Sequence, residues 1–325
     1  MVLKNVIAPE KRRKKLRELL EQKPLVRVIE SHNGLSALVA NDAKLKLEGK
    51  THEFDALWGS GFTDSASKGY PDADIVGVDS RINTINEILN VTNKPLIVDG
   101  DTGRDPNNFE YLVSRLERLG VSAIIIEDKK FPKRNSLISG RQILEDPDIF
   151  ASKIKRGKRV LLTKDFMIIA RIESFISDHG IEDALLRAKR YLMADADGIM
   201  IHSRKKRPDE ILNFAKEYSV MCKELGFRRP LISVPTSYNT ITEKELEKNG
   251  FNIVIYANQL LRAAHKSMEN VCNMILKHGR VFEAESFCTP VVDIFKKVGF
   301  MDIRERDLEE LRRLSKGDHE RSLEE

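Results

Sequence analysis

The segment PLIVDGDTGRDPNNFEYLVSRLERLGVSAIIIED, residues 95–128, decides the fold of this 325-residue chain. It begins with a short apolar run, PLIVDG (95–100), and ends with a second one, SAIIIED (122–128). The amphipathic stretch between them closes with Gly120, a residue type that commonly follows the last turn of a helix. Short, nearly continuous apolar runs are typical of parallel strands buried on both faces. The segment therefore predicts a strand–helix–strand unit.

The same pattern recurs along most of the chain. The other apolar runs are LVRVIE (25–30), DALWGS (55–60), FMIIARIE (166–173), GIMIHS (198–203), PLISVP (230–235) and NIVIYA (252–257). Helical patterns lie at 81–92, 107–120, 180–195, 207–226 and 258–279. Eight strand–helix alternations predict an α/β fold, a (β/α)₈ barrel of the TIM type. No G-x-G-x-x-G follows the first run, which argues against a dinucleotide-binding open sheet.

Both ends of the chain lie outside this alternation. We expect residues 1–23 to form a basic helical lead-in, residues 24–280 the catalytic barrel, and residues 281–325 C-terminal helices with a charged tail. The polar segment 45–54 is expected to be an insertion before the second strand.

The charge of the chain is concentrated at its beginning. The formal net charge is +5, and residues 1–23 hold eight basic and three acidic side chains, which accounts for the whole excess. The stretch KRRKKLRELL (11–20) could contact nucleic acid through phosphates, or it could be a solvated helix face. We favour the solvated face, because charge runs of this kind are commonly surface features.

The cysteine content and the hydropathy of the chain indicate in which cellular compartment the protein occurs. Cys222, Cys272 and Cys288 lie far apart, and their odd number without a CxxC argues against a disulfide framework or a zinc knuckle. No apolar run approaches the roughly 18 residues of a membrane span. The hydrophobic fraction of 41% excludes a wholly disordered chain. We therefore expect a cytoplasmic globular protein without a membrane partner.

Three carboxylates follow neighbouring strands at the ends where barrel enzymes have their active sites. Asp99 and Asp101 are separated only by Gly100, and Glu127 ends the next strand. Converging carboxylate oxygens without cysteine favour Mg²⁺, with Mn²⁺ as a substitute, held partly through waters. The alternative is that these residues are ordinary loop caps.

Two further strand ends carry groups suited to an anion. Arg171 ends a very apolar strand, so it is expected to bind an anionic group or to form a salt bridge with Glu173 or another barrel carboxylate. His202 could donate a hydrogen bond to an oxyanion or could be a satisfied core histidine. The loop at 127–137 could close over an anionic substrate or could be a solvated charged loop.

Several long motifs together resemble the phosphoenolpyruvate mutase family of the isocitrate lyase/phosphoenolpyruvate mutase superfamily. They are SHNGLSA (31–37), WGSGF (58–62), VDGDTG (98–103), EDKKFPKRNSL (127–137), ARIESF (170–175), MIHS (200–203), VPTSY (234–238), YANQLLRAA (256–264) and VVDIF (291–295). They run through most of the predicted barrel in the order that the family has.

The resemblance implies a Mg²⁺-dependent interconversion of phosphoenolpyruvate and phosphonopyruvate, which forms a carbon–phosphorus bond for phosphonate biosynthesis. It implies Asp99 as a direct metal ligand, with Asp101 and Glu127 acting through waters. Positions for the carboxylate and carbonyl end of the substrate match Ser60, Gly61 and Phe62, with Trp58 packed beside them. Positions around the phosphoryl group and the closing loop match Asn135, Ser136, Leu137, Arg171 and His202. Asp72 falls where the family has a functional aspartate, and Lys133 matches a lysine of the mobile loop.

Related activities differ from this pattern in small features. Superfamily lyases carry a cysteine in the loop after the fourth strand, whereas this chain has Phe131-Pro132-Lys133 there. Carbon–carbon cleavage is therefore the weakest alternative. Phosphonopyruvate hydrolases resemble the mutases but typically have threonine at the position of Asn135, so asparagine favours a mutase. The family likeness also implies a homotetramer, a dimer of dimers with exchanged C-terminal helices.

Overall fold

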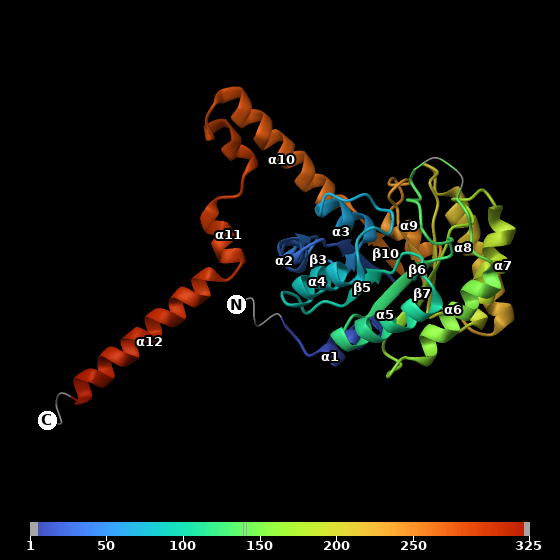
Figure 1. Cartoon of the computed structure of the whole chain (residues 1–325), viewed down its shortest axis with the longest axis horizontal. Helices are drawn as coiled ribbons and strands as arrows, with labels where there is room; N and C mark the ends of the chain where they lie inside the picture. The colour runs from blue at the N-terminus through green and yellow to red at the C-terminus, as the bar shows by residue number, and fades with distance from the viewer. Residues whose placement is uncertain (1–5, 139, 141, 322–325) are drawn as a thin grey trace. The chain divides into compact units, whose positions relative to one another are not determined.

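The computed structural model contains the predicted closed barrel of parallel strands (Figure 1). Its strands are β1 (Val26–Glu30), β4 (Ala56–Gly59), β5 (Leu96–Asp99), β6 (Ala123–Glu127), β7 (Met167–Ile172), β8 (Gly198–Ile201), β9 (Leu231–Ser233) and β10 (Ile253–Tyr256). The barrel closes because β1 pairs with both β10 and β4. The structure describes residues 6–138, 140 and 142–321, so residues 1–5 of the predicted lead-in and 322–325 of the predicted tail lie outside it.

Helices connect the strands around the outside of the barrel, and α10 follows the last strand. The predicted helices correspond to α4 (Val78–Leu89), α5 (Pro106–Leu119), α7 (Gly180–Met193), α8 (Asp209–Leu225) and α10 (Gln259–His278). Four further helices were not predicted from the periodicity, namely α2 (Gly34–Asp42), α3 (Gly61–Ser67), α6 (Pro147–Arg159) and α9 (Glu243–Lys248). The lead-in forms α1 (Pro9–Gln22).

The buried apolar residues form two layers. An inner cluster fills the barrel with alternate strand residues such as Val28, Ile125 and Ile169. An outer cluster lies between strands and helices and includes Ile124 and Ile168. This division follows from the alternation of side chains along each strand, and it explains why the strands read as continuous apolar runs.

Helix α1 packs against the amino-terminal ends of the strands, and its basic residues are structural. Leu16 of α1 is fully buried in the inner cluster. Arg12 is only 2% exposed, and its guanidinium donates to the carbonyl oxygens of Leu89 (2.9 Å) and Thr92 (3.0 Å). Arg17 donates to the carbonyl oxygen of Asp165. The expected solvated helix face is therefore wrong for this side of α1, because the sequence does not reveal carbonyl partners so distant along the chain.

Gly120 ends α5 as predicted, in the left-handed conformation with φ of +85°. A Cβ atom at this position would lie 2.5 Å from the Cα of Pro9. The glycine is thus needed both for its backbone conformation and for the close approach of α1.

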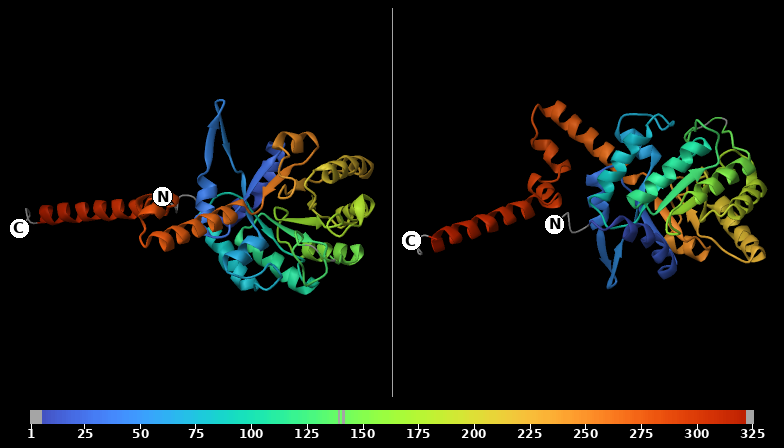
Figure 2. Two further views of the ribbon diagram at one scale, coloured as in Figure 1. Left: turned by 90° about the horizontal axis from the view of Figure 1, so that it is seen from above. Right: turned by 60° about the horizontal axis from the view of Figure 1, so that its bottom comes forward.

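The insertion before the second barrel strand is a β-hairpin. Strands β2 (Lys44–Leu47) and β3 (Lys50–Glu53) pair antiparallel, and the turn between them has positive φ at Glu48 (48°) and Gly49 (74°). Two such residues give a turn whose twist suits a two-residue hairpin. Figure 2 shows the hairpin extending away from the barrel.

The chain divides into two compact units. One contains Ile7–Leu261, and the other contains Val6 and the residues from Arg262 onward. The boundary at residue 280 that we expect from the sequence stays a prediction. Beyond α10, the second unit contains α11 (Val291–Lys297) and α12 (Phe300–Arg321).

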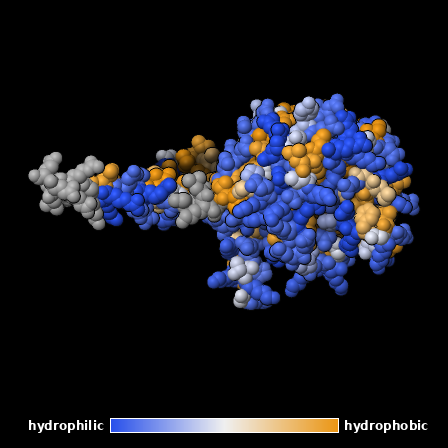
Figure 3. Space-filling view, turned by 90° about the horizontal axis from the view of Figure 1, so that it is seen from below, coloured by the Kyte–Doolittle hydropathy of each residue, from blue (hydrophilic) through white to orange (hydrophobic). Residues whose placement is uncertain are grey.

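The surface of the barrel unit is mostly hydrophilic on the face seen in Figure 3. Among the described residues, no helix combines the length and the apolar character that a membrane span requires.

Candidate active site

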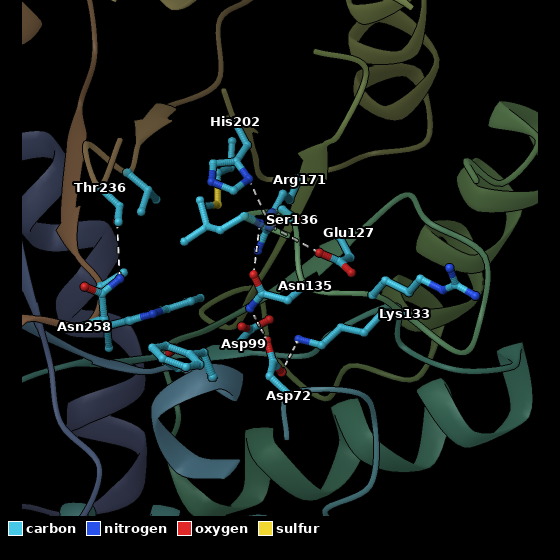
Figure 4. A pocket seen from close by; sticks show the side chains of 18 residues that line it. Asp72, Asp99, Glu127, Lys133, Asn135, Ser136, Arg171, His202, Thr236 and Asn258 are labelled. Atoms are coloured by element: carbon cyan, nitrogen blue, oxygen red, sulfur yellow. Dashed lines mark hydrogen bonds and ion pairs between the residues drawn. The ribbon is translucent and has the colours of Figure 1, made fainter. Parts of the chain in front are cut away.

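A cavity of about 70 Å³ lies at the carboxyl ends of the barrel strands (Figure 4). Polar side chains from several strand ends and from the loop after β6 meet there. The predicted site residues that line it are Trp58, Ser60, Phe62, Asp72, Asp99, Glu127, Lys133, Asn135, Ser136, Leu137, Arg171 and His202. The structure thus brings together side chains that are far apart in the sequence, as the topology of such a barrel requires.

The two predicted residues outside this lining, Gly61 and Asp101, hold Asp99 from both sides. The backbone N–H of Gly61 donates to Oδ2 of Asp99 (3.1 Å), and that of Asp101 donates to Oδ1 (3.1 Å). Asp101 itself has a positive φ of 52°, which aspartate tolerates better than most residues. The carboxylate of Asp99 is therefore fixed by backbone groups at the edge of the cavity.

Two of the three predicted metal ligands, Asp101 and Glu127, are paired with cations. Asp101 forms ion pairs with Arg81 (2.6 Å) and with Lys133. Glu127 forms one with Arg171 (3.3 Å). In the part of the chain that the structure describes, no three Asp, Glu, His or Cys side chains are arranged to hold one metal ion together.

These residues nevertheless fit an ion that is held largely through waters. Asp99 and Glu127 line the same cavity, and Oε1 of Glu127 is a buried oxygen without a hydrogen-bond partner. Burial raises the pKa of Glu127 to about 7. A divalent cation near this carboxylate would favour its charged form. Hard oxygen ligands of this kind suit Mg²⁺, which keeps several waters when it binds proteins.

The closing loop, residues 129–137, is held over the cavity by Lys133 and Asn135. Nζ of Lys133 lies 2.8 Å from Oδ1 of Asp72, and its backbone N–H donates to Asp74 (2.9 Å). The Asn135 amide donates to Oδ2 of Asp72 (2.7 Å). Burial alone would lower the pKa of Lys133, but Asp101 and the other nearby carboxylates raise it well above its ordinary value. The loop is therefore not a solvated charged loop at these positions.

Arg171 and His202 form the opposite side of the cavity. Arg171 forms ion pairs with Glu173 (2.5 Å) and Glu127, so the predicted salt bridge exists, and the residue also lines the cavity. Nδ1 of His202 lies 2.9 Å from Glu173. Burial, followed by the charge of Arg171, lowers the pKa of His202. Both residues are thus partly satisfied by neighbours and still face the space where a ligand would lie.

Comparison with known proteins identifies the family. The family model for phosphoenolpyruvate phosphomutase matches residues 16–276 of the chain. The chain belongs to the phosphoenolpyruvate phosphomutase family. A phosphoenolpyruvate phosphomutase of Tetrahymena pyriformis is 34% identical over 307 residues, which cover 94% of this chain and 97% of that relative.

Solved structures agree with this assignment. The crystal structure of a phosphoenolpyruvate phosphomutase from Streptomyces platensis subsp. rosaceus superposes with a TM-score of 0.83 at 34% identity, covering 91% of this chain and 98% of that one. A phosphonopyruvate hydrolase in complex with oxalate and Mg²⁺ has a TM-score of 0.79 at 34% identity, covering 90% and 97%. The protein is therefore an enzyme with a phosphoenolpyruvate mutase fold. Its sequence is similar both to phosphoenolpyruvate phosphomutases and to a phosphonopyruvate hydrolase.

Sequence reasoning missed several residues of this phosphomutase-family site. The cavity is also lined by Arg134, Met200, Val234, Thr236, Ala257 and Asn258. Thr236 and Asn258 follow β9 and β10, and the Asn258 amide donates to Thr236 (3.4 Å). Their positions at strand ends were visible in the sequence. Arg81 lies on α4, however, and only the fold shows that it reaches Asp101 and the carbonyl oxygen of Asp99 (2.9 Å).

Proposed function

We propose that the protein interconverts phosphoenolpyruvate and phosphonopyruvate and so forms the carbon–phosphorus bond of a phosphonate. The observation that carries the proposal is Asn135, whose side chain lies in the cavity and donates to Asp72. Phosphonopyruvate hydrolases typically have threonine at this position of the loop. An amide at the mouth of the cavity can hold a phosphoryl oxygen without activating a water.

The two sides of the cavity suit the two ends of this substrate. Ser60, Gly61 and Phe62, at the beginning of α3, would bind the carboxylate and carbonyl end. Arg171, His202 and Asn135 would hold the phosphoryl group while the enolate offers either oxygen or carbon to it. Loose phosphoryl transfer needs mainly positioning and charge neutralisation, and this set of residues supplies both.

The metal ion belongs to the carboxylate side of the proposed site. Asp99 would hold Mg²⁺ directly, and Asp101 and Glu127 would hold its waters. When bound, Mg²⁺ would stabilise the enolate as a Lewis acid. The related hydrolase structure with oxalate and Mg²⁺ supports this choice of metal.

The closing loop would protect the reacting group from water. Lys133 and Asn135 of this loop contact Asp72, which lies in the loop after α3. These contacts connect the two sides of the cavity entrance. Exclusion of water matters because the transferred phosphoryl group would otherwise hydrolyse.

Phosphorus NMR of the purified enzyme with phosphonopyruvate and Mg²⁺ tests the proposal. We expect phosphoenolpyruvate as the product, and we expect Asn135→Thr to lower its rate of formation and to increase the share of phosphate. Asn213→Thr, an exposed position on α8, is the matched control and should behave like the parent enzyme. Phosphate and pyruvate as the main products of the parent enzyme would refute the proposal.

A phosphonopyruvate hydrolase is the second candidate. It is favoured by the solved hydrolase structure, whose 34% identity equals that of the phosphomutase structure. The same NMR experiment distinguishes the two reactions, because only hydrolysis releases inorganic phosphate.

We further propose that the protein is a cytoplasmic homotetramer with exchanged C-terminal helices. The second unit exposes large apolar side chains, including Leu276 (84%) and Phe282 (76%). Contiguous exposed apolar residues often mark interfaces between proteins. Light scattering tests the assembly, and a monomer at micromolar concentration would refute it.

A further inference from the structure

Glu173 is a buried residue that follows β7. The proposed reaction does not explain the contacts of its carboxylate. Its side chain is fully buried, and each oxygen has two partners. Oε1 lies 2.5 Å from Nε of Arg171 and 2.9 Å from Nδ1 of His202. Oε2 lies 3.0 Å from Nζ of Lys129 and accepts a hydrogen bond from Ser136 (2.6 Å). Burial alone would raise the pKa of Glu173, but Arg171, Lys129 and His202 hold it well below its ordinary value, so the group is ionised.

The ionised carboxylate determines which nitrogen of His202 carries hydrogen. A carboxylate only accepts hydrogen bonds, so the contact with Glu173 is a hydrogen bond only when Nδ1 of His202 donates. The guanidinium of Arg171 also lies 3.0 Å from Nδ1. The same guanidinium nitrogen of Arg171 has other acceptors in Ser136 (2.8 Å) and Glu127 (3.3 Å). It therefore does not need Nδ1 of His202 as an acceptor.

This arrangement leaves Nε2 of His202 as a hydrogen-bond acceptor. In a neutral imidazole only one nitrogen carries hydrogen, and the position of that hydrogen is set by the partner of the other nitrogen. His202 lines the cavity beside Arg171 (Figure 4). A lone pair there suits a ligand oxygen that carries a proton, as in a monoprotonated phosphonate or phosphate.

The same carboxylate reaches the closing loop. Ser136 donates to Glu173 and in turn accepts a hydrogen bond from Arg171. Lys129, at the start of the loop, donates to the hydroxyl of Ser136 (2.5 Å) and to the carbonyl oxygen of Arg134 (2.9 Å). Glu173 therefore connects the position of the loop with the orientation of the two residues at the phosphoryl side.

We infer that Glu173 is a positioning residue that holds His202 as the Nδ1–H tautomer, so that Nε2 accepts a hydrogen bond from a protonated phosphoryl oxygen of the substrate. The identity of the substrate rests on the proposed function, whereas the tautomer is a property of the free protein. The two can therefore be tested separately.

Nitrogen-15 NMR of the histidine rings in the full chain, compared between the parent protein and Glu173→Ala, tests the inference. The variant lacks the carboxylate, and the guanidinium of Arg171, which can only donate, still lies beside Nδ1 of His202, so Nδ1 should accept. We expect the Nδ1–H tautomer in the parent and the Nε2–H tautomer in the variant. We also expect at least a tenfold loss of kcat for phosphonopyruvate with a smaller change in KM. Glu182→Ala, an exposed change on α7, should match the parent in both measurements.

A parent His202 that carries its hydrogen on Nε2 would overturn the inference, and so would a variant with the parent tautomer. Loss of turnover in Glu173→Ala without a change of tautomer would indicate a purely structural role and would also overturn it. If the variant does not fold, the spectrum of the parent protein still decides the tautomer. If the parent turns over neither substrate, the proposed function fails while the NMR result stands.

Discussion

Replacing Gly100 with alanine should damage both the packing of the barrel and the predicted metal site. A Cβ atom at this position would lie 2.7 Å from Cδ1 of Ile124 and 2.8 Å from Cγ2 of Ile126. Both isoleucines are fully buried in the outer cluster, so neither can move into solvent. The strain must then shift the backbone that carries Asp99 and Asp101 on either side.

The size of the effect follows from the packing. Overpacking of a buried site costs about 1–3 kcal/mol. For a domain of this size each kcal/mol lowers the melting temperature by roughly 2–4 °C, so we expect a decrease of about 2–12 °C. Displaced carboxylates should also weaken Mn²⁺ binding by about tenfold or more, as changes around metal ligands commonly do.

Differential scanning calorimetry and electron paramagnetic resonance titration with Mn²⁺ measure the two effects. Gly59→Ala is the matched control for stability, because a Cβ atom on β4 would lie 3.8 Å from Val98, an ordinary contact. If Gly100→Ala melts with the control and binds Mn²⁺ as the parent does, the packing argument is wrong.

Three further predictions concern stability, metal and pH. Arg12→Ala removes a buried guanidinium that donates to the carbonyl oxygens of Leu89 and Thr92. Urea denaturation should therefore show a free energy of unfolding lower by about 1.5–3 kcal/mol. An unchanged free energy of unfolding would contradict the structural role given to α1. Treatment with EDTA should abolish turnover of phosphonopyruvate and added Mg²⁺ or Mn²⁺ should restore it, whereas activity that persists without metal would exclude the proposed metal role. Burial and then Arg171 lower the pKa of His202 from 6.5, so NMR titration should find a neutral ring at that pH, and a ring already half protonated there would contradict this. Because the unfolded chain then binds the proton more readily, the contribution of His202 to folding stability is complete above pH 6.5 and is lost as the pH falls below it.

The barrel was predictable because its strands are marked by local sequence. Even β9, with only three residues, lies inside the apolar run PLISVP. Among the helices that were missed, α2 and α9 lack an equally clear pattern, whereas α6 buries Phe150 and Ile154 one turn apart. Helix α9 has six residues, and α2 buries Ser36 and Ala37 together with Leu38 instead of showing a strong apolar stripe. Their positions depend on tertiary packing more than on periodicity.

The site was predictable where it follows strand ends. Asp99 and Glu127 end their strands, Arg171 is the last residue but one of β7, and the register places Glu127 beside Arg171. Arg81 follows no strand, and its long side chain reaches the site from α4. Glu173 lies within a recognisable motif, but the sequence does not show that Lys129 and Ser136 fold back onto it. Pairings of this kind depend on loop geometry, which the residue pattern does not encode.

The positions of the charges explain why net charge says little about this enzyme. The basic residues of α1 that contact the barrel donate to carbonyl groups before the strands begin, at the end opposite the cavity, and Arg17 also pairs with the carboxylate of Asp197. The cavity itself is lined by three acidic residues, Asp72, Asp99 and Glu127, and by three basic ones, Lys133, Arg134 and Arg171. A ligand with both a carboxylate and a phosphoryl group would bring several negative charges into a lining with no formal excess of either sign. A divalent cation beside Asp99 would offset two of those charges, which gives metal dependence an electrostatic reason in addition to the chemistry of the enolate.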